Sequence, residues 1–224
     1  MFPSIIQRAD NMRNPLSKEM SRLVLSFLLG VGGTGVVTQT ELINQFTTQE
    51  VKQISAQPAA TQDQIMNQFL NEKEGNRLTA YQDGKGIWTI CRGITRIDGK
   101  QVQRGLRLTT TQCDLLNQKE SDLALEWVRK NIPVQLNQIQ QVGIASFCPY
   151  NLGADRCRYN KNGTKTQFWR YIEKADWKNA CKHIPDWIFD GGKDCRIRSN
   201  NCAGQVLRRD QEEYLCLLQL GEVK

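Results

Sequence analysis

Residues 74–93, EGNRLTAYQDGKGIWTICRG, decide the fold of this chain. Glu74 closes a short helical pattern, IMNQFLNEKEG, because a glycine follows it directly. Period-two stretches come next, with Asp-Gly turns at Asp83-Gly84 and Asp98-Gly99. This order predicts a helix that leads straight into a small antiparallel sheet.

Helical patterns dominate the rest of the chain. The first opens with a Thr109-x-x-Gln112 capping box, and three more follow it; together they cover 108–132, 135–153, 164–189 and 204–220. Pro185 is expected to bend or end the third pattern. The predicted fold class is therefore α+β: a small antiparallel β-lobe and a larger helical lobe, within a domain over 65–224.

Three side chains in the deciding stretch suit one kind of chemistry. Glu74 stands at a helix end, Asp83 in a turn and Thr89 on the next strand, and the chain reverses between them. Two carboxyl groups and a hydroxyl that converge on a cleft suit glycosidic hydrolysis, which needs one proton donor and one ionised carboxylate. Glutamate at a helix end and aspartate in a turn are also common without any catalytic role.

The same residues resemble the motif of the phage-type lysozymes, glycoside hydrolase family 24. In that family Glu, eight residues, Asp, five residues and Thr recur, and Glu74, Asp83 and Thr89 match all three positions. The resemblance runs from about Ile65 to Leu220 and includes SFCPYNLG and WIFDGGKDCRIRSNNCAGQVLRRDQE. Many relatives carry a histidine after the glycine of TICRG, where this chain has Ile94-Thr95.

The resemblance implies a role for each of the three residues. Glu74 is the general acid, Asp83 positions or activates water and stabilises the transition state, and Thr89 hydrogen-bonds the same water. It favours inversion of configuration, which needs room for that water between the carboxyl groups. Tyr150 and Asn151 are candidate substrate-binding residues that line the groove.

Other conspicuous side chains are interpreted as structural. His183 suits a surface or capping role, and the five tryptophans suit the core better than sugar platforms. Arg208 and Arg209 are expected to pair with Glu212, with Asp210 or with acids of another helix rather than with substrate.

The eight cysteines all lie at or after Cys91, and none forms a C-x-x-C motif. With one histidine in the chain, we expect no metal site; an even count at scattered spacing favours four disulfides in an oxidising compartment. Eight cysteines alone allow 105 pairings. The resemblance places Cys148 with Cys157 and Cys195 with Cys202. For the four cysteines that remain we expect Cys91–Cys113, which would tie the sheet to the following helix, and Cys181–Cys216, which would join two helices of the larger lobe.

The segment before the domain contains LLGVGGTGVVT (28–38), which fits the dinucleotide pattern G-x-G-x-x-G. No second buried strand follows it, so a nucleotide site is not favoured and no cofactor is expected. Residues 23–40 are uncharged, and as a helix they would span about 27 Å of a hydrocarbon layer about 30 Å thick. Nine strongly apolar residues, four glycines and five polar residues predict a weak membrane anchor; an N-terminal strand or a buried helix is the alternative.

The chain is thus divided into a basic N-terminal segment (1–22), a weak signal-anchor helix (23–40), a linker (41–64) and a lysozyme-like catalytic domain (65–224). The alternative for the linker is a loose amphipathic helix that Pro58 breaks. Basic residues before the apolar run predict a cytoplasmic N-terminus, and the segment resembles signal-anchor-release sequences of endolysins. We therefore expect a host inner-membrane protein that is later released to the periplasm.

The predicted function is that of an endolysin, a muramidase that cuts the glycan of peptidoglycan to lyse a Gram-negative host. The net charge of +7 suits an anionic partner, but Lys and Arg are interspersed with acids, which argues against nucleic acid. A monomer is expected. The alternatives are a non-catalytic peptidoglycan-binding module and a toxin delivered to the periplasm of competitors.

Overall fold

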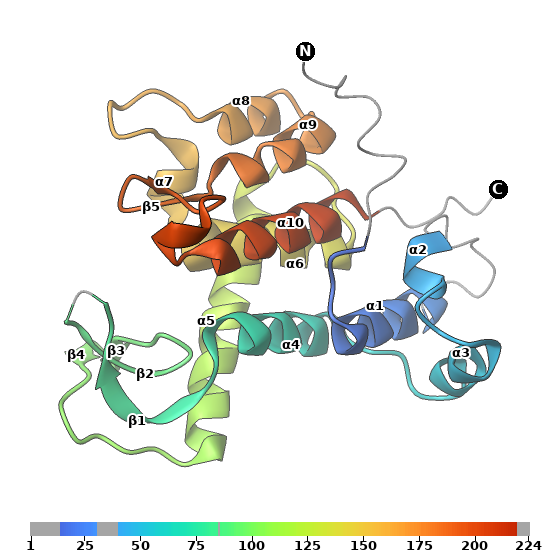
Figure 1. The fold of residues 1–224 in the computed structure, drawn as a ribbon, viewed down its shortest axis with the longest axis horizontal. Coiled ribbons are helices and arrows are strands. Elements are labelled where there is room, and N and C mark those ends of the chain that lie inside the picture. The colour runs from blue at the N-terminus through green and yellow to red at the C-terminus, as the bar shows by residue number, and fades with distance from the viewer. Residues whose placement is uncertain (1–13, 31–39, 85, 219–224) are drawn as a thin grey trace.

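The computed structural model describes residues 14–30, 40–84 and 86–218, and the fold has two lobes joined by one long helix (Figure 1). Helix α5 (Thr110–Asn131) runs from the small β-lobe into the larger helical lobe. Helix α4 (Gln62–Glu74) packs across it and delivers the chain into the first strand. The α+β class predicted from the sequence is confirmed.

The β-lobe holds two antiparallel hairpins. Strand β1 (Arg77–Gln82) pairs with β2 (Trp88–Cys91), with Tyr81 opposite Thr89, and the register shifts before Tyr81. Strand β3 (Arg96–Ile97) pairs with β4 (Lys100–Gln101) around the Asp98-Gly99 turn, where both residues have positive φ. The lobe has a small core of its own, built from Ile90, Cys91, Ile94, Val102 and Cys113.

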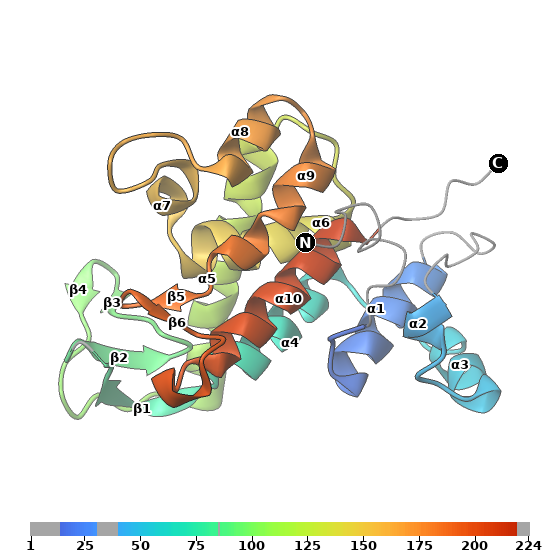
Figure 2. The same cartoon turned by 45° about the horizontal axis from the view of Figure 1, so that its top comes forward.

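The larger lobe is helical, with a third hairpin near its edge (Figure 2). After α5 come α6 (Gln138–Ala145), the π-helical turn η2 (Ser146–Asn151), α7 (Ala154–Arg158), α8 (Gln167–Glu173), α9 (Trp177–Lys182), the 3-10 turn η3 (Ile184–Asp186), strands β5 (Phe189–Asp190) and β6 (Lys193–Asp194), the 3-10 turn η4 (Arg198–Asn200) and α10 (Ala203–Leu217). The third predicted helix is broken earlier than Pro185, because Ala175 has a positive φ of 56° and separates α8 from α9.

Helices α6 and α10 approach each other unusually closely at Gly143. A Cβ on Gly143 would lie 2.7 Å from the backbone nitrogen of Cys216 and 2.7 Å from the carbonyl oxygen of Glu212. Both are backbone atoms of α10, so they cannot move aside without shifting the helix. The absence of a side chain at this position is what lets α10 lie against α6.

The N-terminal segment forms a helix that packs against the domain. Helix α1 (Lys18–Gly30) buries Met20, Ser21, Val24, Leu25 and Phe27, and it packs on α3 and α4. It begins five residues before the expected anchor helix (23–40), and the expected continuation over 31–39 lies outside the described residues, as do residues 1–13. None of the helices in the described part of the chain has the length and apolar character needed to cross a bilayer.

The segment expected as a linker, 41–64, is folded in the structure. It holds α2 (Thr40–Ile43) and α3 (Thr48–Ser55), and it buries Leu42, Phe46, Ile54 and Ala60. A capping box between Thr47 and Glu50 starts α3, and Glu50 also pairs with Lys18 of α1 at 2.8 Å. Tertiary contacts with α1 therefore order a Gln- and Thr-rich stretch that has little apolar periodicity of its own.

The structure contains the four disulfides that were expected: Cys91–Cys113, Cys148–Cys157, Cys181–Cys216 and Cys195–Cys202. The first joins β2 to α5, and the third joins α9 to α10. The other two close short loops in the larger lobe. No cysteine in the chain remains unpaired.

We predict that Gly143→Ala lowers the free energy of unfolding by about 1–3 kcal/mol, because the added methyl group forces α6 and α10 apart. Gly204→Ala, in the first turn of α10, is the matched control, since a Cβ there meets no atom within 4 Å. It should leave stability unchanged or slightly raised. Urea unfolding of the oxidised proteins measures both, and equal stability of the two variants would contradict the close approach.

Candidate active site

Glu74 stands where α4 ends and the β-lobe begins. A capping box between Thr61 and Gln64 starts α4, and Ile65, Met66, Phe69 and Leu70 anchor its inner face in the main core. Gly75 ends the helix with a positive φ of 67°. The glutamate side chain is thus carried to a fixed point between the lobes, where 27% of it remains exposed.

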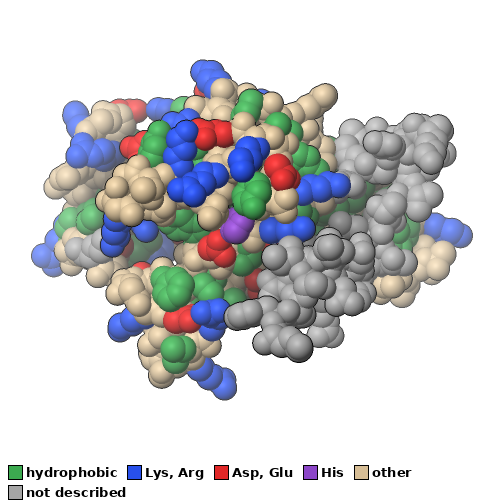
Figure 3. Space-filling view, turned by 90° about the horizontal axis from the view of Figure 1, so that it is seen from above, with side chains coloured by type: hydrophobic (Ala, Val, Ile, Leu, Met, Phe, Trp, Pro, Cys, Tyr) green, Lys and Arg blue, Asp and Glu red, His purple; other side chains and the backbone are tan. Residues whose placement is uncertain are grey.

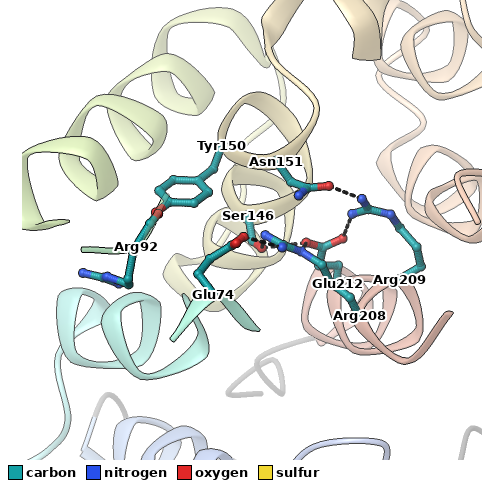
Figure 4. A network of polar contacts seen from close by, with 8 residues as sticks. All are labelled: Glu74, Arg92, Ser146, Tyr150, Asn151, Arg208, Arg209 and Glu212. Atoms are coloured by element: carbon teal, nitrogen blue, oxygen red, sulfur yellow. Dashed lines mark hydrogen bonds and ion pairs between the residues drawn. The ribbon is translucent and has the colours of Figure 1, made fainter. Parts of the chain in front are cut away.

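Arg208 of α10 holds the carboxylate of Glu74. Its Nη1 donates to Glu74 Oε1 at 2.5 Å, and its Nε donates to Glu212 Oε1 at 3.0 Å (Figure 4). Burial alone would lower the pKa of Arg208, but attraction to Glu212 and Glu74 outweighs it and raises that pKa above its ordinary value. The guanidinium is therefore a permanent cation that orients the glutamate.

Glu212 lies at the centre of a buried network. Its side chain is fully buried and accepts hydrogen bonds from Arg208, from Arg209 and, at 2.6 Å, from Ser146 Oγ. Arg209 also binds Asn151 Oδ1 and donates from Nε to the carbonyl oxygen of Trp187 at 3.2 Å. Two arginines and two glutamates balance one another, which makes such deep burial of charge tolerable. The expected pairing of both arginines with Glu212 is confirmed.

Asp83 and Thr89 meet at the peptide units of Ile87. The amide of Ile87 donates to Asp83 Oδ1 at 2.9 Å, and Thr89 Oγ1 donates to the Ile87 carbonyl oxygen at 3.0 Å. Asp83 is half-buried in the turn, while Thr89 on β2 is only 3% exposed. The hairpin thus brings these two candidates together, and only Gly75 and Asn76 separate Glu74 from the same hairpin.

Tyr150 and Asn151 occupy different surroundings. Tyr150 Oη donates to the carbonyl oxygen of Arg92 at 3.2 Å, so it links η2 to the end of β2, and burial raises its pKa to about 12. It lines a cavity of about 600 Å³ between the lobes, together with residues 92–96, Pro149 and the α5 residues Glu120, Leu123, Ala124 and Trp127. Asn151 does not line this cavity; its side-chain oxygen is bound by Arg209.

Sequence reasoning missed a second buried polar cluster, around Arg92. Arg92 is 4% exposed, and its Nη2 donates to Asn67 Oδ1 at 2.5 Å while its amide donates to Asn117 Oδ1 at 3.2 Å. The partners come from α4 and α5, far away in the chain. A lone arginine after a strand carries no local sign of such partners, so only the fold could reveal it.

The single histidine and the acidic residues do not build a metal centre in the described part of the chain. No group of three or more His, Cys, Asp and Glu side chains there is placed to hold an ion. His183 stacks on Tyr171 at 5.3 Å and lies 2.7 Å from Asp186 Oδ2. These contacts give it a structural role at the end of α9.

Comparison with known proteins gives one family. Residues 71–212 match the phage lysozyme family. The chain is 56% identical over 156 residues to the SAR-endolysin of Escherichia phage 933W, and 53% identical over the same length to a probable prophage lysozyme of Escherichia coli K12; each match covers 70% of this chain and 85% of the relative.

Solved structures point the same way. The active form of P1 phage endolysin Lyz is similar with a TM-score of 0.57 and 25% identity, over 68% of this chain and 82% of that one. A lysozyme of phage P22 gives a TM-score of 0.53 and 27% identity, over 68% of this chain and 94% of that one.

We predict that Glu212→Gln destabilises the protein by about 3–5 kcal/mol, because two buried guanidinium groups lose the charge that balances them. Urea unfolding at neutral pH measures the loss. Glu126→Gln is the control: Glu126 is an exposed residue that pairs with Lys130 on α5, and its removal should produce no measurable change. Equal stability of the two variants would show that the charge of Glu212 does not stabilise the two buried arginines.

Proposed function

Because the chain belongs to the phage lysozyme family, we propose that Glu74, Asp83 and Thr89 form its catalytic site. The protein is a glycoside hydrolase, a muramidase that degrades peptidoglycan for host-cell lysis. The bond cut is the β-1,4 linkage between N-acetylmuramic acid and N-acetylglucosamine. The observation that carries the assignment is the motif spacing within the matched region, with its glutamate held by a buried arginine.

Glu74 acts as the general acid in this proposal. It protonates the glycosidic oxygen, so that the sugar leaves as an alcohol while positive charge develops on the neighbouring ring. Its position supports the role: the side chain is partly exposed between the lobes, and Arg208 binds only one of its two oxygens. The other oxygen is left to carry the proton that a general acid must donate. Because the Arg208 guanidinium also donates to Glu212 and Ser146, it is held in one orientation and in turn orients the Glu74 side chain.

Asp83 and Thr89 handle the attacking water. The Thr89 hydroxyl donates its hydrogen bond to the Ile87 carbonyl oxygen, so toward a water molecule its oxygen can act only as an acceptor. A water that donates to Thr89 and to the Asp83 carboxylate would be held and polarised between them. The Ile87 amide keeps Asp83 oriented, which supports this division of work.

Tyr150 contributes to the groove for the glycan strand. Its hydroxyl, neutral at all physiological pH values, joins the larger lobe to the β-lobe beside the cavity of about 600 Å³. Asn151 acts indirectly: by accepting from Arg209 it helps to hold the network behind Glu74. We therefore assign substrate contact to Tyr150 and a positioning role to Asn151.

We further propose that residues 23–40 insert in the host inner membrane with a cytoplasmic N-terminus, and that the enzyme is then released to the periplasm. Several relatives carry the name SAR-endolysin. Nine apolar residues at roughly −0.3 to −0.6 kcal/mol each favour insertion by only a few kcal/mol, and glycines and polar residues oppose it. Such a segment can leave the bilayer.

The packing of α1 supports a soluble destination for this segment. Its apolar residues Met20, Val24 and Leu25 are fully buried against the domain. Its polar groups also find partners in the folded state: Ser26 Oγ accepts from the Ala60 amide, just before α4, at 3.1 Å, and Ser21 Oγ accepts from Asn14 Nδ2 at 3.0 Å. In lipid those hydroxyls would have fewer partners, so docking on the domain competes well with the membrane.

We predict that Glu74→Gln nearly abolishes lysis of outer-membrane-stripped cells while it leaves the fold intact, because the isosteric amide cannot donate the required proton. Loss of turbidity measures the rate, and circular dichroism checks the fold. Glu126→Gln, which changes the same charge at an exposed site, should retain full activity. If Glu74→Gln keeps more than about a tenth of the rate, it controls less than about 1.4 kcal/mol of the barrier and is not the acid.

We predict that the combined changes Gly32→Leu, Gly33→Leu and Gly35→Leu keep the protein in the membrane fraction and prevent lysis. The three leucines make the segment more hydrophobic, so that it does not leave the bilayer. Gly30 is left unchanged, since a Cβ there would lie 2.1 Å from Ala59 Cβ and would also disturb docking of α1. Alanine at the same three positions should have a weaker effect. Soluble enzyme and lysis on the normal schedule from the leucine variant would contradict release from an anchor.

A further inference from the structure

A second cavity opens in the larger lobe, apart from the residues assigned to catalysis. It has a volume of about 890 Å³ and is lined by residues of α7, of the loop that follows it, of η3 and of the β5–β6 hairpin. Three aromatic side chains line it: Tyr159, Trp187 and Phe189. Its size is in the range of small-ligand sites.

Two of these rings are unusually exposed. Tyr159 is 45% exposed and Phe189 is 54% exposed, although each lies on the wall of the same cavity. Single exposed apolar residues need no explanation, but two beside a third aromatic ring mark a contact surface. The hairpin also brings Gly191 and Gly192 to the wall, both at positive φ, so a ligand can approach the backbone there.

The aromatic wall is fixed before any ligand arrives. Trp187 packs edge-on against Phe147 of the core at 6.0 Å, and the Arg156 guanidinium lies 5.9 Å from its ring centre. Its carbonyl oxygen is bound by Arg209. Tyr159 is held by an antiparallel bridge to Lys165. Little ordering would be needed on binding, which favours affinity.

The charges around the cavity select the kind of ligand. Asp155, Asp186 and Asp190 line the cavity together with Arg156 and Lys161, so acids outnumber bases. The face of the molecule drawn in Figure 3 differs, because Lys and Arg are more abundant there than Asp and Glu. A peptide stem rich in carboxylates gains nothing in the cavity, whereas a neutral sugar can stack on the rings and hydrogen-bond to aspartate, arginine and Asn160.

We infer that this cavity is an accessory glycan subsite that binds neutral N-acetylhexosamine units of a peptidoglycan strand. The inference rests on the proposed muramidase function, because the strand in the cleft would be the source of those units. The subsite connects to the cleft through Trp187, Arg209, Glu212 and Arg208, the last of which holds Glu74. Its occupation retains the strand and lowers KM without taking part in bond cleavage.

The test measures binding separately from cleavage. Binding to purified sacculi is measured with the full chain that carries Glu74→Gln, and again with the same chain that also carries Tyr159→Ala and Phe189→Ala. Tyr159 and Phe189 are both exposed, so their replacement spares the core. We expect the double change to weaken binding about tenfold. In otherwise wild-type enzyme it should raise KM and leave kcat within about twofold. Leu115→Ala, which removes a 69% exposed apolar residue on α5, should change neither.

Competition identifies the ligand. Glycan strands stripped of their peptides should displace the Glu74→Gln protein from sacculi, and they should do so less well once Tyr159 and Phe189 are replaced. The subsite is overturned if the double variant binds like the control, or if free stem peptides compete where stripped glycan does not. Failure of the proposed function would appear elsewhere, as hydrolysis that persists in Glu74→Gln.

Discussion

The buried carboxylate of Glu212 is the interaction on which the rest of the site depends. It accepts from two arginines and a serine, and through them it joins α10 to η2, to the loop before β5 and to the end of α4. An ionised group without water must be fully paired, so every one of these segments has to be in place at once. Glu74, which we propose as the catalytic acid, is 27% exposed, whereas the side chains of Arg208, Arg209 and Glu212 are 7% exposed or less.

This constraint explains several features of the surrounding fold. Gly143 lets α10 lie against α6, which places Glu212 beside Ser146. The Cys181–Cys216 disulfide fixes the same helix from the other side. Arg208 then points toward Glu74, and Arg209 points toward Asn151 and Trp187. One geometry of α10 therefore serves both the cleft and the aromatic wall of the second cavity.

Local features of the site could be read from the sequence, and distant ones could not. The helix that ends at Gly75, the Asp-Gly hairpins and the capping box at Thr109 follow from short-range rules. The family resemblance supplied two of the disulfide pairs, Cys148–Cys157 and Cys195–Cys202. The Arg92 cluster depends on asparagines of two other helices, and α3 owes its order to α1. Propensity within a window cannot report contacts of that range. Asn151 shows the same limit, since its position was predicted near the groove but its partner is Arg209.

The first cysteine in the chain is Cys91, and every covalent cross-link closes downstream of it. The polypeptide thus has a cross-linked part, from Cys91 onward, and a leading segment of ninety residues that carries no disulfide. Both carboxylates of the motif, Glu74 and Asp83, belong to that leading segment, whereas Arg208 and Glu212 belong to the cross-linked part. Glu74 is therefore held against Arg208 by packing and by an ion pair, and no covalent cross-link ties any residue before Cys91 to the rest of the chain.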